Sequence, residues 1–256
     1  VLYKKSIRSR LNFPILASLF VLAIVGTTVV GWYLRPWPVM DEAKSALDGN
    51  GKVKVQRKEI GGVSTIAFTL ENPGEPALIF YPGARVPVRA YSPHLLEIAK
   101  KGFQVFAVEM PLNLAVIGWK KAGKIIGENQ EIKSWAIAGH SMGGAMAARF
   151  IARTDYKIDG LVLWASYPPK KAVLPENMKA LSITGTRDGV ISQSRLDKSK
   201  DQLPPDTTFI SIEGGNHGQF GWYGFQSGDL KASISREKQM KVIIDDTVEF
   251  LFKLAN

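Results

Sequence analysis

Short apolar runs alternate with amphipathic segments along most of the chain. Six runs have the length and composition of buried strands, at residues 77–83, 103–110, 134–141, 160–167, 179–186 and 207–215. Apolar residues recurring at helical spacing predict helices over residues 91–102, 114–126, 143–154, 194–203 and 235–255. This alternation predicts an α/β fold, a mostly parallel twisted sheet with helices on both faces.

A different pattern precedes the alternating part. Residues 53–60 and 63–70 are separated by Gly61 and Gly62, which predicts a β-hairpin at the start of the sheet. Residues 35–50 are more polar and are predicted to form a linker with a short helix. Residues 51–256 are then long enough to form one domain with a sizeable core.

Residues 11–34 contain no charged side chain. As a helix they would span roughly 36 Å at about 1.5 Å per residue, enough to cross a hydrocarbon core of about 30 Å. The apolar run is longer than that of a cleaved signal peptide, and bulky Trp32 and Tyr33 lie near its end. A retained transmembrane signal-anchor is therefore favoured over a cleaved signal or a buried soluble helix.

The charges that flank this stretch predict its orientation. Residues 1–10 carry four basic residues and no acid, whereas Asp41 and Glu42 follow the stretch. By the positive-inside rule, the basic segment is expected in the cytoplasm and everything after Trp37, including the catalytic domain, on the extracytoplasmic side. The lipid bilayer is thus an expected partner.

The composition excludes several function classes. The 256 residues include 33 basic and 23 acidic ones, a formal net charge of +10, but the basic residues are scattered rather than gathered in a stripe. We therefore expect no nucleic-acid binding. The absence of cysteine excludes disulfides, cysteine-ligated metals and a thiol nucleophile.

The segment 139–143 reads GHSMG and matches the pattern G-x-S-x-G. Three fixed residues arise by chance too often to carry an argument alone. Here the motif follows a predicted strand and opens a predicted helix, which is the setting of a nucleophile elbow. Ser141 is therefore the candidate nucleophile, and a glycine-rich turn without chemistry is the alternative.

A serine nucleophile needs a histidine base that a carboxylate orients, and the chain has three histidines. His140 adjoins the serine and is expected to pack, while His94 is expected on the surface of the first helix of the sheet domain. His217 follows the last predicted strand and is the candidate base. Asp188 follows the strand before it and is the candidate acid.

The order Ser141, Asp188, His217, with FYPGARV at 80–86 upstream, resembles the α/β-hydrolase family over roughly residues 50–256. The segments 81–86, 110–116 and 213–224 are similar, more narrowly, to small dienelactone-hydrolase-like proteins. Their usual nucleophile is a cysteine, which this chain lacks. The resemblance therefore implies the fold and serine-hydrolase chemistry but no particular substrate.

Two backbone amides are expected to form the oxyanion hole: that of Met142, after the nucleophile, and that of Ala84, with Arg85 as the near alternative. The candidates for a substrate pocket are Arg85, Trp164, Tyr167 and Phe220, although the aromatic ones could equally belong to the core or a lid. The short connection between residues 167 and 179 leaves no room for a large lid and favours small substrates.

The sequence thus predicts a membrane-anchored serine hydrolase, carboxylesterase-like, that cleaves a small ester or related acyl substrate without a cofactor or metal. A thioester or amide is a less favoured substrate. The alternative from another class is a catalytically silent binding module of the same fold at the membrane surface. A peptidase or a carbon–carbon bond hydrolase is a third interpretation.

Overall fold

The computed structural model describes residues 13–255, without the side chains of residues 13–16, 29, 30 and 33. The chain divides into two compact units, residues 1–35 and residues 36–256. The first contains helix α1 (Phe13–Tyr33). The predicted basic segment 1–10 and the start of the predicted span 11–34 lie outside the described residues. Within the described part, no helix combines the length and apolar character needed to cross a membrane.

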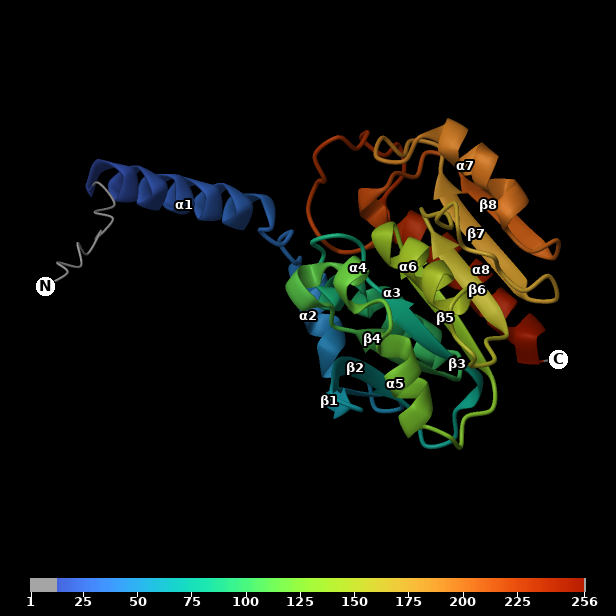
Figure 1. Ribbon diagram of the computed structural model, residues 1–256. Coiled ribbons are helices and arrows are strands. Elements are labelled where there is room, and N and C mark those ends of the chain that lie inside the picture. Colours follow the sequence, from blue (N-terminus) through green and yellow to red (C-terminus); the bar gives the residue numbers. More distant parts are fainter. Residues whose placement is uncertain (1–12, 256) are drawn as a thin grey trace, which may run out of the picture. The chain divides into compact units, whose positions relative to one another are not determined.

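The second unit is built on an eight-stranded sheet with the order β1-β2-β4-β3-β5-β6-β7-β8 (Figure 1). Strands β3 to β8 are parallel, while the β1–β2 hairpin is antiparallel and pairs with β4 through β2. The strands are β1 (Lys54–Ile60), β2 (Val63–Thr69), β3 (Gly74–Tyr81), β4 (Phe103–Val108), β5 (Trp135–His140), β6 (Gly160–Trp164), β7 (Lys179–Gly185) and β8 (Thr207–Ile212). The predicted hairpin, the six strands and the α/β fold are confirmed.

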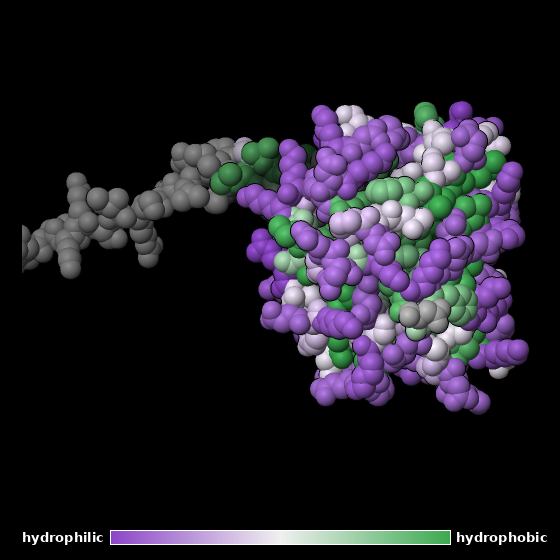
Figure 2. Space-filling model, turned by 90° about the vertical axis from the view of Figure 1, so that its right-hand side faces the viewer, coloured by the Kyte–Doolittle hydropathy of each residue, from purple (hydrophilic) through white to green (hydrophobic). Residues whose placement is uncertain are grey.

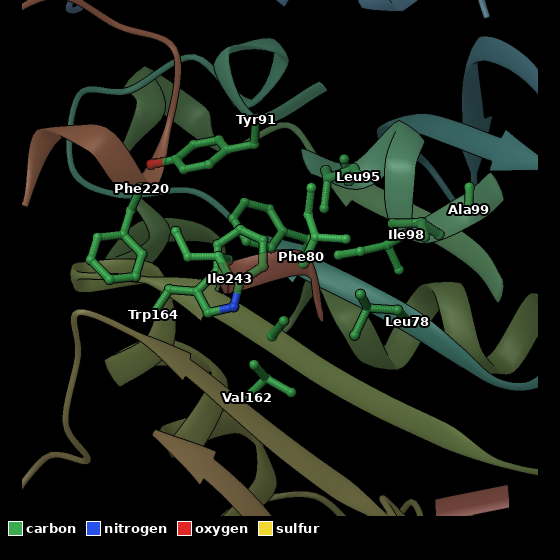
Figure 3. Close-up of a cluster of buried hydrophobic side chains, with 14 of the residues drawn as sticks. Leu78, Phe80, Tyr91, Leu95, Ile98, Ala99, Val162, Trp164, Phe220 and Ile243 are labelled. Carbon is green, nitrogen blue, oxygen red and sulfur yellow. The ribbon is translucent and has the colours of Figure 1, made fainter. Parts of the chain in front are cut away.

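Helices cover both faces of the sheet (Figure 1). They are α2 (Asp41–Ser45), α3 (Ser92–Lys100), α4 (Ala115–Gly118), α5 (Lys121–Glu128), α6 (Met142–Ile151), α7 (Gln193–Ser199) and α8 (Arg236–Ala255). Alternate residues of a strand point to opposite faces, so Leu78 and Phe80 pack with α3 and α8 in one core, shown in Figure 3. Ile79 and Tyr81 pack on the other face with α5 and α6.

The helix predicted over residues 114–126 is divided into α4 and α5. The hydroxyl of buried Tyr81 lies at the break, where it donates to the Trp119 carbonyl oxygen and accepts the Ala122 amide, both at 2.8 Å. These two bonds satisfy a buried hydroxyl and the backbone groups that the break leaves unpaired. Hydrophobic periodicity contains no signal for such a break.

The position of His94 differs from the one predicted from the sequence. It was expected on the surface of α3, but its side chain is fully buried and tilted against Trp164, with ring centroids 5.6 Å apart. Neither ring nitrogen has a hydrogen-bond partner in the described structure. Burial, with a smaller effect of Arg236, lowers the pKa of His94 from 6.5 to about 3. His94 is therefore a neutral core residue.

This burial predicts a loss of stability in acid. Between pH 6.5 and pH 3 the unfolded chain binds a proton at residue 94 and the folded chain does not, so the free energy of unfolding falls as the pH is lowered, by about 1.4 kcal/mol per pH unit. His94→Leu is expected to flatten the fall in melting temperature between pH 7 and pH 5. Thermal unfolding followed by circular dichroism measures this, and an unchanged pH slope would contradict it.

The view from the side of the edge strand β8 shows hydrophilic side chains around a smaller group of apolar ones (Figure 2). Phe209 on β8 contributes to the apolar exposure, with 47% of its surface accessible. Loops follow β3, β5, β7 and β8 at the carboxyl ends of these parallel strands. These loops carry the residues that the sequence selected.

Candidate active site

Ser141 lies on a sharp turn between β5, which ends at His140, and α6, which begins at Met142. Its backbone has φ 52° and ψ −122°, a conformation that side-chain-bearing residues rarely adopt and that costs about 1–3 kcal/mol. The end of the neighbouring strand β6 holds this turn in place. The Ser141 amide donates to the Trp164 carbonyl oxygen at 2.9 Å, and the Ser166 hydroxyl donates to the Ser141 carbonyl oxygen at 2.6 Å. The strained turn is the one predicted for a nucleophile elbow.

Glycines make this turn possible. A Cβ atom on Gly139 would lie 2.5 Å from backbone atoms of Gly143 and Gly144, so strand and helix could not approach as closely. A Cβ on Gly143 would overlap the carbonyl oxygen of Tyr81. The close packing of α6 on β3 and β5 therefore depends on the absence of side chains here.

Asp188 and His217 form a buried pair. Asp188 follows β7 and His217 follows β8, and their Oδ2 and Nδ1 atoms are 2.7 Å apart. The second oxygen of Asp188 accepts the amides of Val190 and Ile191, both at 2.8 Å. With the carboxylate accepting the Nδ1 proton, Nε2 of His217 is the basic nitrogen.

Nε2 of His217 is buried and has no hydrogen-bond partner in the described structure, so the hydroxyl of Ser141 does not reach it here. The turn of Ser141 and the loop of His217 are nonetheless adjacent. The ring of His140, the residue before the serine, has its centroid 4.5 Å from that of the His217 ring. Catalytic hydrogen bonds in free hydrolases often close only when substrate binds. The structure thus brings together the loops of all three residues selected from the sequence.

The candidate oxyanion donors are distinguished by their neighbours. The Arg85 amide donates to the Asn113 carbonyl oxygen at 2.8 Å and is therefore committed elsewhere. The amides of Ala84 and Met142 donate to no protein acceptor in the described chain, and Met142 is the first residue of α6. Of the two alternatives in the upstream loop, Ala84 is the one with an available N–H. At Met142, the dipole of α6 further favours negative charge near the backbone N–H.

A histidine–tyrosine pair supports the oxyanion loop. The Tyr91 hydroxyl lies 2.8 Å from His140 Nδ1 and accepts the Gly83 amide at 3.0 Å. Burial and, less strongly, the neighbouring histidines hold the pKa of His140 well below 6.5, so the ring is neutral and Nδ1 accepts the tyrosine proton. Phe220 stacks on the same ring at an interplanar angle of 13°. His140 is a packing residue, as predicted, and links β5 to the loop that carries Ala84.

Asp229 is another residue near the site that the sequence did not single out, as are Tyr91 and Ser166. Its carboxylate accepts the amides of Gly189, beside the candidate acid, and of His217 and Gly218, at 3.0, 3.2 and 2.7 Å. It also accepts the amide of Leu230 at 2.9 Å. One buried side chain therefore joins the acid loop to the base loop. Sequence patterns contain no signal for it, because its donors are backbone amides up to 40 residues away.

Replacing that carboxylate is expected to loosen both loops. In Asp229→Asn the amide nitrogen faces at least one backbone N–H, so a buried donor loses its acceptor, which costs about 1–3 kcal/mol. We expect a lower melting temperature together with a lower kcat for any substrate of the site. Asp201→Asn, at an exposed position, is the control. Equal behaviour of the two variants would show that Asp229 does not hold the loops.

The pocket candidates separate into core and surface residues. Trp164 is fully buried and donates to the Thr247 hydroxyl at 3.2 Å, and Phe220 is fully buried as well. Both belong to the hydrophobic core, the alternative that the sequence left open for the aromatic candidates. Tyr167 and Arg85 are partly exposed; the Tyr167 hydroxyl accepts from Arg195 at 3.5 Å, and Arg85 lies over the Trp37 ring at 4.9 Å.

Fold and site together define a hydrolase of the α/β type, and comparison with known proteins agrees. The profile of the alpha/beta hydrolase family matches residues 77–241, and the chain belongs to this family. No curated protein sequence matches the chain. The narrower likeness to dienelactone hydrolases stays a prediction.

Solved structures share the fold at low sequence identity. A Thermus thermophilus protein is 16% identical with a TM-score of 0.61, over 80% of this chain and 99% of its own. An esterase from Pyrococcus furiosus is 13% identical with a TM-score of 0.59, over 87% and 98%. An esterase/lipase from an uncultured bacterium is 12% identical with a TM-score of 0.61, over 83% and 88%.

Proposed function

We propose that the chain is a serine carboxylesterase in which Ser141, His217 and Asp188 form the catalytic triad. The observation that carries this proposal is the buried 2.7 Å contact between Asp188 Oδ2 and His217 Nδ1, beside the strained turn at Ser141. The resemblance in fold to proteins described as esterases supports an ester as the substrate.

The proposed reaction uses these groups in order. The Ser141 hydroxyl attacks the ester carbonyl carbon while His217 Nε2 takes its proton, and the amides of Met142 and Ala84 stabilise the negative oxygen that forms. His217 then gives the proton to the departing alcohol, which leaves an acyl group on Ser141. Water attacks that acyl-enzyme with His217 again as the base and releases the acid. Asp188 keeps the imidazole in the required tautomer throughout.

We further propose that residues 11–34 anchor this enzyme in a membrane, with residues 1–10 in the cytoplasm and the hydrolase unit outside. The uncharged stretch in the sequence supports this, as do the exposed apolar side chains of α1, among them Leu19, Phe20 and Leu22. Protease added outside intact cells should digest the hydrolase unit. Protection of that unit would contradict the orientation.

A panel of p-nitrophenyl esters tests the catalytic proposal. The full chain should hydrolyse short acyl esters, and Ser141→Ala should lose this activity, whereas Ser194→Ala, at an exposed position on α7, should keep it. A folded wild type that hydrolyses no ester would favour the binding-module alternative. Turnover of peptides in place of esters would favour a peptidase.

A further inference from the structure

Two hollows adjoin each other beside the loop that follows β6. One, of about 490 Å³, lies between residues 167–170 and α7, and the other, of about 270 Å³, lies between residues 169–172 and α6. They share Pro169 and Lys170. The larger one has the size of a small-molecule site.

The linings of both hollows are positively charged. Lys170, Arg195 and Lys198 line the larger hollow, and Lys170 is joined at the smaller one by Arg149, Arg153 and Lys171. Neither lining contains an aspartate or glutamate. The ion pairs of the described chain are all formed by other basic residues, so none of these six is paired with a carboxylate there. Asp197, on the same helix as Arg195, pairs instead with Lys200 at 2.9 Å.

The lining of the larger hollow includes the loop after β6, which also contacts the turn of Ser141. This lining begins at Tyr167, next to Ser166, whose hydroxyl contacts the backbone of Ser141. On its other side, α7 follows the loop of Asp188 directly along the chain, and Arg195 of α7 donates to the Tyr167 hydroxyl. The hollow is thus bordered by the loop after β6, which contacts the Ser141 backbone, and by α7, which follows the loop of the candidate acid.

A buried acceptor adds a polar feature to this lining. The side-chain oxygen of Gln202 is buried without a hydrogen-bond partner in the described structure. The oxygen and nitrogen of an amide are assigned from their neighbours, and the opposite orientation would present an N–H₂ donor here. Cations, a tyrosine hydroxyl and an amide are together the groups that proteins use to bind carboxylates and phosphates.

We propose that the larger hollow binds an anionic group on the substrate, at the end remote from the bond that is cleaved. This inference rests on the proposed esterase function and names its substrate class: esters that carry a carboxylate or phosphate. The cations attract such a substrate and orient it, while the chemistry at Ser141 is unchanged. Exposed ion pairs are individually weak, so three of them together should give a preference of about tenfold.

Matched esters test the proposal. The p-nitrophenyl monoester of adipic acid is the anionic substrate, with the hexanoate ester as the neutral and the 6-aminohexanoate ester as the cationic equivalent, and the spontaneous hydrolysis of each is subtracted. We expect kcat/KM to be about tenfold higher for the adipate than for the hexanoate at low salt, with the preference reduced in 0.5 M NaCl. An equivalent ester ending in phosphate tells which anion binds better, and a preference for either anion supports the proposal.

Two triple variants distinguish the effect of the charges in the hollow from the effect of the protein's overall charge. The first variant combines Lys170→Gln, Arg195→Gln and Lys198→Gln. In it the preference should disappear through a rise in KM for the anionic ester, with the rate on hexanoate retained. Lys52→Gln, Lys58→Gln, Lys101→Gln removes the same charge at exposed positions that line neither hollow and should keep the preference.

The outcomes distinguish a failure of the proposed anion site from a failure of the proposed esterase function. Equal hydrolysis of adipate and hexanoate, or a preference that survives in the first triple variant, would overturn the anion site while leaving the esterase in place. Loss of binding to phosphatidylglycerol vesicles in that variant, with no change in ester preference, would also overturn it and indicate a membrane contact. Absence of turnover on every ester would instead refute the esterase itself.

Discussion

Asp188→Asn is expected to lower kcat for p-nitrophenyl ester hydrolysis by about 10⁴-fold. In the structure the carboxylate accepts a proton from His217 Nδ1, so Nε2 is free to take the proton of Ser141. An asparagine can place its N–H₂ group against Nδ1, which stabilises the opposite tautomer, in which Nε2 carries the hydrogen and cannot act as a base. KM should change little, because Asp188 is not expected to touch the substrate.

The matched control is Asp197→Asn, which makes the same chemical change on the exposed surface of α7. Its kcat should stay within about twofold of the wild type, since exposed ion pairs contribute little. Steady-state kinetics on one short acyl ester measure both variants. If Asp188→Asn retained more than a tenth of the activity, another residue would have to orient the base.

Gly143→Ala has the largest expected effect on stability. The added Cβ would overlap the Tyr81 carbonyl oxygen and lie 2.5 Å from that of Pro82. These are backbone atoms at the end of a central strand, which cannot move aside as a flexible side chain can. We expect a loss of about 4 kcal/mol or more in the free energy of unfolding, a fall of about 10 °C or more in the melting temperature of a domain of this size.

Gly51→Ala is the control for this change. No atom lies within 4 Å of a Cβ placed at Gly51, and its backbone is not in the left-handed region. Its effect should stay within about 1 kcal/mol. Thermal unfolding followed by circular dichroism compares the two variants. Similar melting temperatures for both would show that the turn at Ser141 relaxes without cost.

Much of the fold could be predicted because burial is encoded locally. The run that contains β5 is buried along its whole length, and β5, β7 and β8 are each followed by a glycine-rich turn that carries Ser141, Asp188 or His217. The carboxyl ends of parallel strands lie at one edge of a sheet, so residues distant in sequence were expected to meet. The structure pairs Asp188 with His217 in the way this reasoning requires.

The rest could not be predicted because it depends on contacts between distant segments. His94 has the surroundings of a surface residue in the sequence but packs against Trp164, which is 70 positions away. Trp164 itself ends a strand near the site, yet its indole donates to Thr247 on α8 and is part of the core. The role of Asp229 arises from backbone amides, which every residue type carries. None of these three contacts leaves a local pattern.

The nucleophilic role of Ser141 is the central claim, and labelling by a fluorophosphonate probe tests it most directly. The probe forms a covalent bond only with a serine that a neighbouring base activates. The full-length wild type should gain one adduct, located on Ser141 by peptide mass spectrometry, and Ser141→Ala should gain none while Ser194→Ala labels as the wild type does. A folded wild type that takes up no probe, or an adduct that persists in Ser141→Ala, would contradict the account.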